Sequence, residues 1–301
     1  MAIADPRALL LKSHDLYGNS GTLIDVTVES AGWEYTGLRV IRMASGEAYT
    51  QSTGQDEVAL VPLAGRCSVT AAGQTWQIGE RESPVAGKPW ALYLPLQSEF
   101  EVIAETPLEL AITSARAEVA HPPKLITPDD VAVEIRGAGN AARQINHIIA
   151  PSFPADKLLV VEVFTPSGNW SSYPPHKHDV HNMPAEADLE EIYYYRIYPE
   201  DGFGLQRLHT ADGTVDEAYV IHDGDLLLVP EGYHTFAMAQ GYTGYYLNIL
   251  AGDEPVRTMQ PSDDPTLAWV RATWTDEMNE GIASWQDIET RLNGAAGRRQ
   301  D

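Results

Sequence analysis

The sequence predicts an all-β protein of two successive barrels with a short C-terminal helix. The chain has 301 residues, of which 44% are hydrophobic, so it can bury a substantial core. Its apolar residues lie mostly in short runs of β-branched and aromatic side chains, separated by Gly, Pro and Asp. A stretch with three prolines in twelve positions divides these runs into two series. We therefore expect a first barrel over residues 1–118, a linker over 119–130, and a second barrel with the helix over 131–301.

The first barrel is expected to consist of strands with no periodic helix between them. Gly65, Gly73 and Gly79 separate the apolar runs at the spacing of turns in a β-sandwich or barrel. The expected strands cover residues 22–28, 38–43, 58–63, 67–70, 91–94 and 108–113.

The second barrel is expected to contain a longer series of strands. Asp212-Gly213 lies between two of them and predicts a tight hairpin turn. In residues 276–292, apolar side chains recur at helical spacing, which predicts the terminal helix. The expected strands cover residues 132–135, 158–164, 191–197, 203–210, 219–222, 226–229, 235–238 and 245–250.

A faint internal repeat favours a duplicated fold. Residues 57–61 (EVALV) resemble residues 191–195 (EIYYY), and residues 93–95 (YLP) resemble 228–230 (LVP), at nearly the same offset. This alignment pairs Glu57 with Glu191.

The composition excludes several classes of partner. Forty-three acidic residues against 20 Lys and Arg give a formal charge of −23, which disfavours nucleic acid and anionic membranes. No apolar run is long enough to span a bilayer and no signal peptide is evident, so we expect a cytoplasmic protein. The one cysteine, Cys67, cannot form an internal disulfide. A homo-oligomer is expected because edge strands of barrels need covering.

Seven of the nine histidines fall between His147 and His234, which places the chemistry in the second half. The sharpest signal is His176-Lys177-His178, directly after two prolines that disfavour a helix. On a strand, positions i and i+2 project to the same face with Cα atoms ~6.6 Å apart, so the two imidazoles can converge on one ion. The alternative is a polar surface loop.

Two further residues complete a metal-ligand set. Glu191 opens an aromatic strand, and His234 follows a Pro-Glu-Gly-Tyr turn. Three imidazoles and a carboxylate suit a divalent transition metal. Zinc or manganese is expected, with iron and nickel as alternatives.

Several longer strings resemble known proteins. Gly168, His176-x-His178, an acid, and Gly224-x5-Pro230-x-Gly232-x-His234 resemble the two motifs of the cupin superfamily. Within it, the chain resembles the 5-deoxy-glucuronate isomerases of myo-inositol catabolism, which are related to 4-deoxy-L-threo-5-hexosulose-uronate ketol-isomerase. The strings that carry this resemblance are residues 170–179 (WSSYPPHKHD), 189–195 (LEEIYYY), 223–225 (DGD), 229–234 (VPEGYH) and 241–248 (GYTGYYLN).

The resemblance implies two cupin barrels, each a double-stranded β-helix or jelly roll. It implies conversion of 5-deoxy-D-glucuronate to 5-dehydro-2-deoxy-D-gluconate, so the partner is a small sugar acid. The metal ligands it implies are His176, His178, Glu191 and His234. Glu190 is the rival acid, because only one of two adjacent strand residues can face the barrel interior.

The first barrel is expected to lack a metal. It has Tyr49-Thr50-Gln51 where the histidine pair would lie, and Glu57 and Glu99 remain as its only counterparts of the ligands. We expect it to serve in packing and assembly.

Isomerisation through a metal-stabilised enediol needs a proton shuttle and a group that binds the substrate carboxylate. The candidates for the shuttle are Tyr193, Tyr195 and His209, and Arg207 is the candidate for the carboxylate. A structural role is the alternative for each. Two other functions remain open: an Fe(II) cupin oxygenase, or a sugar-acid-binding cupin without turnover.

Overall fold

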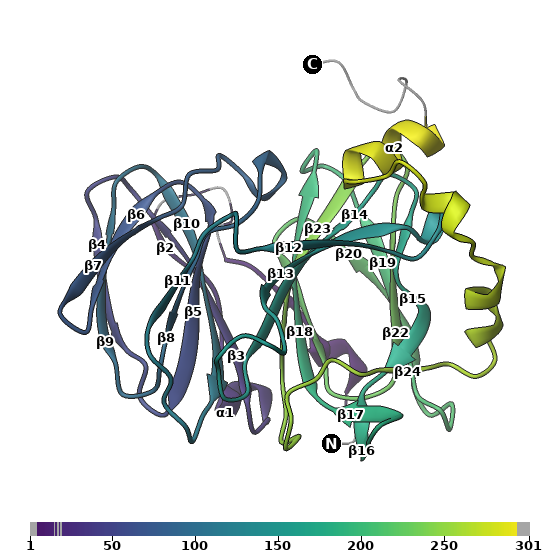
Figure 1. Ribbon diagram of the computed structural model, residues 1–301, viewed down its shortest axis with the longest axis horizontal. Helices are drawn as coiled ribbons and strands as arrows, with labels where there is room; N and C mark the ends of the chain where they lie inside the picture. Colours follow the sequence, from purple (N-terminus) through teal and green to yellow (C-terminus); the bar gives the residue numbers. More distant parts are fainter. Residues whose placement is uncertain (1–4, 15, 17, 19, 294–301) are drawn as a thin grey trace.

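The computed structural model describes residues 5–14, 16, 18 and 20–293. It consists of two β-barrels side by side, with the first half of the chain in one and the second half in the other (Figure 1). Each barrel pairs one large antiparallel sheet with one smaller sheet. The prediction of two successive barrels is confirmed.

The first barrel encloses an apolar interior that includes Val58, Leu60, Cys67 and Phe100. Helix α1 (Val28–Ala31) is a single turn closed by a Thr27–Ser30 capping box. The six-stranded sheet runs β11 (Lys124–Ile126), β8 (Ala91–Leu94), β5 (Asp56–Ala64), β10 (Leu108–Arg116), β3 (Thr36–Met43) and β2 (Gly21–Val26). The four-stranded sheet runs β4 (Ala48–Ser52), β9 (Glu99–Ala104), β6 (Cys67–Ala71) and β7 (Gln74–Ile78).

The second barrel has larger sheets and a small separate hairpin of β16 (Asp179–Asn182) and β17 (Glu186–Asp188). Its seven-stranded sheet runs β1 (Leu10–Lys12), β21 (Asp225–Val229), β18 (Glu190–Tyr198), β23 (Thr243–Ala251), β14 (Leu159–Thr165), β13 (Arg143–Ile149) and β12 (Ala132–Arg136). Its five-stranded sheet runs β20 (Asp216–Ile221), β19 (Gly204–His209), β22 (Tyr233–Met238), β15 (Trp170–Lys177) and β24 (Ser262–Asp263).

Helical segments are few and short. The described residues contain no helix long and apolar enough to cross a membrane. Helix α2 (Trp285–Asn293) covers one end of the second barrel (Figure 1), where Trp285 stacks on Phe164 at 5.9 Å. The remaining turns are 3₁₀ helices at Pro6–Leu9, Pro84–Ala86, Gly139–Ala141, Ala268–Thr273 and Asp276–Asn279.

The two large sheets pack face to face and form a core between the barrels. Because successive side chains on a strand point to opposite faces, one strand serves two cores. On β18, Ile192 and Tyr194 lie in the core between the barrels, whereas Tyr193 and Tyr195 lie inside the second barrel.

Two buried or half-buried carboxylates join the barrels reciprocally. Glu57 on β5 accepts hydrogen bonds from three successive backbone N–H groups at residues 156–158, just before β14. Glu190 on β18 accepts from three backbone N–H groups at residues 34–36, where β3 begins. By position and role, Glu57 therefore corresponds to Glu190, and the sequence alignment of Glu57 with Glu191 was wrong by one residue.

The predicted strands all overlap observed strands, and some observed strands were not predicted. The first barrel gains β4, β7 and β9, and the second half of the chain gains β13, β15, β16, β17 and β24. In β15, Pro174 and Pro175 obscure the strand pattern. The terminal helix begins at Trp285, since Gly281 has a positive φ of 75° that ends the preceding 3₁₀ turn.

Two strands depart from the expected division of the chain. β1, within residues 1–118, pairs with β21 of the second barrel. β11, within the expected linker, pairs with β8 of the first. Residues 1–4 and 294–301, at the ends of the expected ranges, lie outside the described residues.

Glu57→Gln should lower the free energy of unfolding by about 3 kcal/mol, because one amide oxygen cannot replace a buried carboxylate that accepts three N–H groups and the Tyr93 hydroxyl. Chemical denaturation measures this loss. Glu99→Gln, at an exposed position, is the control and should leave stability within about 0.5 kcal/mol. Equal effects of the two substitutions would contradict the role of Glu57.

Candidate metal centre and its cavity

Three histidines from two neighbouring strands converge inside the second barrel. His176 lies on β15 directly opposite His234 on β22, and His178 follows the end of β15. The ring centroids are 4.8 Å apart for His176 and His234 and 5.2 Å apart for His178 and His234. One ring nitrogen from each lies within 4.8 Å of the others, a grouping that could hold a metal ion.

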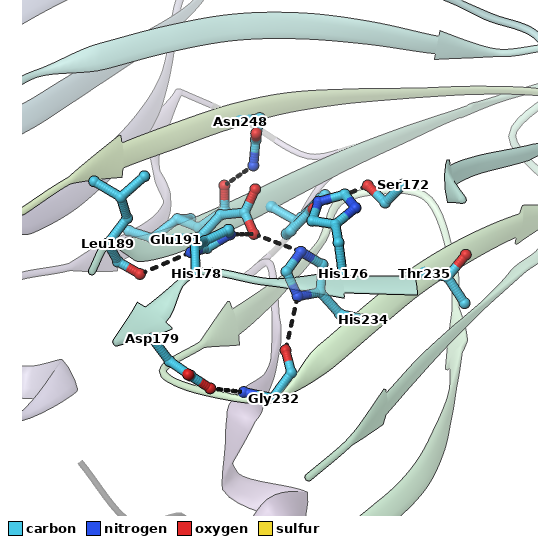
Figure 2. Close-up of polar contacts among 12 residues, drawn as sticks. Ser172, His176, His178, Asp179, Leu189, Glu191, Gly232, His234, Thr235 and Asn248 are labelled. Carbon is cyan, nitrogen blue, oxygen red and sulfur yellow. Dashed lines mark hydrogen bonds and ion pairs between the residues drawn. The ribbon is translucent and has the colours of Figure 1, made fainter. Parts of the chain in front are cut away.

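Glu191 enters the same cluster from β18 in the opposite sheet. Its Oε2 lies 2.9 Å from Nε2 of His178 and 2.9 Å from Nε2 of His234. Figure 2 shows the four side chains pointing toward one another. The structure therefore brings together the four predicted ligands. Glu190, the residue next to Glu191 on β18, projects to the opposite face of the sheet.

Backbone carbonyls orient the three imidazoles. Nδ1 of His178 lies 3.0 Å from the carbonyl oxygen of Leu189, and Nδ1 of His234 lies 3.1 Å from that of Gly232. In His176, Nδ1 lies 3.4 Å from the carbonyl oxygen of Pro174. Each carbonyl oxygen can accept a hydrogen bond from Nδ1–H, and in that tautomer Nε2 presents its lone pair, as is usual for histidine ligands.

The donor set fits a metal ion. Nε2 of His234 is buried and, among the described residues, has no hydrogen-bond partner, although the Glu191 carboxylate is close. A buried polar atom without a partner is costly, and coordination of a cation would satisfy it. Three imidazoles and one carboxylate match the preferences of divalent transition metals.

The charges within the cluster favour a cation. Burial opposes ionisation of Glu191, but His234 and His178 outweigh it and hold the pKa of this carboxyl well below its usual range. Burial likewise favours neutral His178, yet the Glu191 carboxylate outweighs it and raises the pKa of the imidazole. Burial lowers the pKa of His176 well below its usual value, so this ring stays neutral. The cluster thus holds one negative charge that a proton or a metal ion can neutralise.

A cavity beside the cluster is lined by residues that strands β12 to β15, β18 and β23 supply. Tyr193 lies in its wall, with its hydroxyl 3.1 Å from the hydroxyl of Ser172. Tyr195 is deeper in the barrel, where its hydroxyl donates to Gln206 at 3.1 Å. Of the two predicted tyrosines, Tyr193 is therefore the one that lines the cavity.

Arg207 and His209 lie elsewhere. On β19 the buried side chains are Gln206 and Leu208, so alternation directs Arg207 and His209 to the outer face. Arg207 pairs with Asp216 at 2.8 Å, and both side chains are exposed. The structure therefore does not bring these two sequence candidates to the cavity.

Sequence reasoning missed several residues of the cavity wall. Arg143 and His147 lie on β13, which was not predicted, although the alternation Arg-x-Ile-x-His is a strand signal. Ser172, Tyr246 and Asn248 lie within the strings that carry the family resemblance, but the sequence analysis assigned them no role. The missed residues include Arg136, Arg143, His147, Ser172, Tyr246 and Asn248.

Comparison with known proteins identifies the family. Residues 9–270 match the KduI/IolB family. The chain is 46% identical to a 5-deoxy-glucuronate isomerase of Geobacillus thermodenitrificans (strain NG80-2), over 87% of this chain and 95% of that protein. The chain belongs to the KduI/IolB family.

Solved structures agree with this membership. The fold is similar to that of an IolB-like protein from Salmonella typhimurium LT2, with a TM-score of 0.83, 41% identity, and 87% of this chain and 98% of that chain covered. Oxalate decarboxylase of Lactobacillus farciminis has a TM-score of 0.62 at 12% identity, covering 93% and 95% of the two chains. The second likeness concerns the fold alone, and the expected pair of cupin barrels is confirmed.

Substitution of Glu190 and Glu191, one at a time, should show which of the two binds the metal. Glu191→Gln removes the charge that faces the histidines, so we expect metal affinity to fall by at least about 100-fold. Metal content of the purified protein, measured by plasma mass spectrometry, checks this result. Glu190→Gln is the matched control: it should retain the metal and lose stability instead, since Glu190 binds the backbone of the first barrel. The reverse order of metal loss would move the ligand to Glu190.

Proposed function

We propose that this protein converts 5-deoxy-D-glucuronate to 5-dehydro-2-deoxy-D-gluconate in myo-inositol catabolism. The observation that supports this most is a three-histidine cluster with an adjacent carboxylate, opening on a cavity, in a member of the KduI/IolB family. Relatives at 38–46% identity bear the name 5-deoxy-glucuronate isomerase.

His176, His178, Glu191 and His234 would hold one divalent transition metal, with zinc or manganese favoured over iron or nickel. A divalent cation at this position supplies the positive charge that stabilises the oxyanion developing as the C2 proton is removed. His178, Glu191 and His234 are buried and His176 is half-buried, so little water reaches the ligands and electrostatic interactions at the site are strengthened.

Two groups in the cavity wall are suited to proton transfer. Burial, with the negative charge of Glu191, raises the pKa of Tyr193 well above its usual value, so its hydroxyl remains protonated and can donate. Nε2 of His147 lies 2.9 Å from the carboxylate of Glu134, which orients the imidazole as a general base is oriented in hydrolases. We assign Tyr193 as the donor and His147 as the acceptor in this reaction.

A direct assay tests the proposed function and its alternatives. Metal-free protein, prepared with a chelator, should be inactive on 5-deoxy-D-glucuronate and should recover upon addition of zinc or manganese, as followed by NMR. Oxygen uptake coupled to turnover would indicate an oxygenase instead. Binding of the sugar acid without a new ketose signal would indicate a binding protein.

Tyr193→Phe should lower kcat by about 100-fold or more with metal content unchanged, because it removes only the hydroxyl that lines the cavity. Tyr195→Phe is the matched control on the same strand, and its hydroxyl contacts Gln206 rather than the cavity. We expect it to retain kcat within about threefold. Similar losses in both variants would show that the tyrosines act through packing.

A further inference from the structure

The cavity wall contains an arginine that the metal centre does not use. Arg143 begins β13 and lies directly opposite Arg136 on β12. Arg136, Arg143, Ile145 and His147 line the same cavity as His176, His178 and Glu191. Two guanidinium groups therefore lie in the wall of the cavity that His176, His178 and Glu191 also line.

Arg143 differs from the other buried arginines in its partners. Arg81 pairs with Glu162 at 2.9 Å, and Arg196 pairs with Asp223 at 2.9 Å. Arg143 is 2% exposed, and among the described residues no carboxylate forms an ion pair with it. A buried charge without a counter-charge is costly, so an anion from outside the chain is the expected partner.

The pKa values of the three buried guanidinium groups also set Arg143 apart from Arg81 and Arg196. Burial alone would lower the pKa of Arg81 and Arg196, but their carboxylate partners outweigh it and raise both values. For Arg143, burial dominates and lowers the pKa to about 10. The guanidinium remains charged near neutrality and retains an unmet attraction for an anion.

The backbone around Arg143 is built to hold its guanidinium. Nη1 donates to the carbonyl oxygens of Ala141 and Tyr173, each at 3.1 Å. Gly137 has a φ of +78°, and a Cβ there would come within 2.6 Å of the same Nη1 and 2.2 Å of the Ala141 carbonyl oxygen. These contacts use one nitrogen of the fork and fix its orientation.

Arg136 is already neutralised in part. Its guanidinium makes two hydrogen bonds to Glu134, at 2.7 and 2.9 Å, and its side chain is 41% exposed. Glu134 also contacts His147. Arg143 is therefore the stronger anion-binding group, and Arg136 can add only a weaker, solvent-screened attraction.

We propose that Arg143 binds the carboxylate of the sugar-acid substrate. This inference rests on the proposed function, because a uronic acid has its carbonyl and its carboxylate at opposite ends. Arg143 and the predicted ligands His176, His178 and Glu191 line one cavity, so a bound uronic acid can present its carboxylate to the guanidinium and its carbonyl to the cluster. Charge-assisted hydrogen bonds from a fixed guanidinium would orient the substrate and select acids over neutral sugars.

Kinetics with a charged and a neutral substrate test this role. Turnover of 5-deoxy-D-glucuronate is compared with that of 5-deoxy-D-glucose, which has a hydroxymethyl group in place of the carboxylate. Arg143→Gln should lower kcat/KM for the acid by about 100-fold and change that for the neutral sugar by less than about threefold. Arg66→Gln, at an exposed ion pair of the first barrel, is the control and should change neither.

Conservative variants guard against a folding defect. Arg143→Lys keeps the charge and loses the planar fork, so KM for the acid should rise about tenfold while kcat for the neutral sugar stays constant. Equal losses on both substrates in the soluble variants would overturn the proposal and show a structural role.

Binding of D-glucuronate and D-glucose, measured by calorimetry on the metal-loaded protein, separates this inference from the proposed function. Wild type should bind the acid more tightly than the neutral sugar, and Arg143→Gln should abolish the difference. If binding shows this pattern but wild type does not isomerise 5-deoxy-D-glucuronate, the proposed function fails and the carboxylate site stands. If the variant binds the acid as wild type does, the carboxylate site is wrong.

Discussion

The alternation of side chains along β18 connects the metal centre to the joint between the barrels. One face of the strand presents Glu191 and Tyr193 to the interior of the second barrel. The other face presents Glu190 to the backbone of the first barrel and Tyr194 to the core between them. A shift of one residue in this strand would exchange the two faces, so the register of β18 fixes both the ligand and the barrel contact.

The first barrel contributes to the site by holding this large sheet in place. Its interior is filled with apolar side chains, and Glu57 and Glu99 both point away from that interior. Buried ion pairs cross to the second barrel, Arg81 to Glu162 on β14 and Glu109 to Arg196 on β18. Such pairs are costly to break singly, and we infer that they specify how the two sheets dock rather than add greatly to stability.

The electrostatics of the cavity differ from those of the whole chain. The formal charge of −23 repels anions at long range. Within the cavity wall, however, Arg143 and Arg136 lie beside a cluster suited to a dication. At physiological ionic strength the distant acids are screened within about 8 Å, whereas the buried cations are screened much less. An anionic substrate is therefore favoured at the site despite the acidic surface.

The sequence by itself determined the two-barrel fold, the position of the chemistry and the common face of His176 and His178, because strand alternation is encoded in neighbouring residues. That Glu191 and His234 join them was predicted from the resemblance to a known family. Only the tertiary structure decided which other residues join them. Arg207 does not line the cavity, because its side chain projects from the exposed face of β19. Arg143 lines the cavity, because β12, β13 and β14 pair to form that part of its wall. These outcomes depend on how separate strands pair and which face meets a cavity, and such long-range contacts leave no pattern in either strand alone.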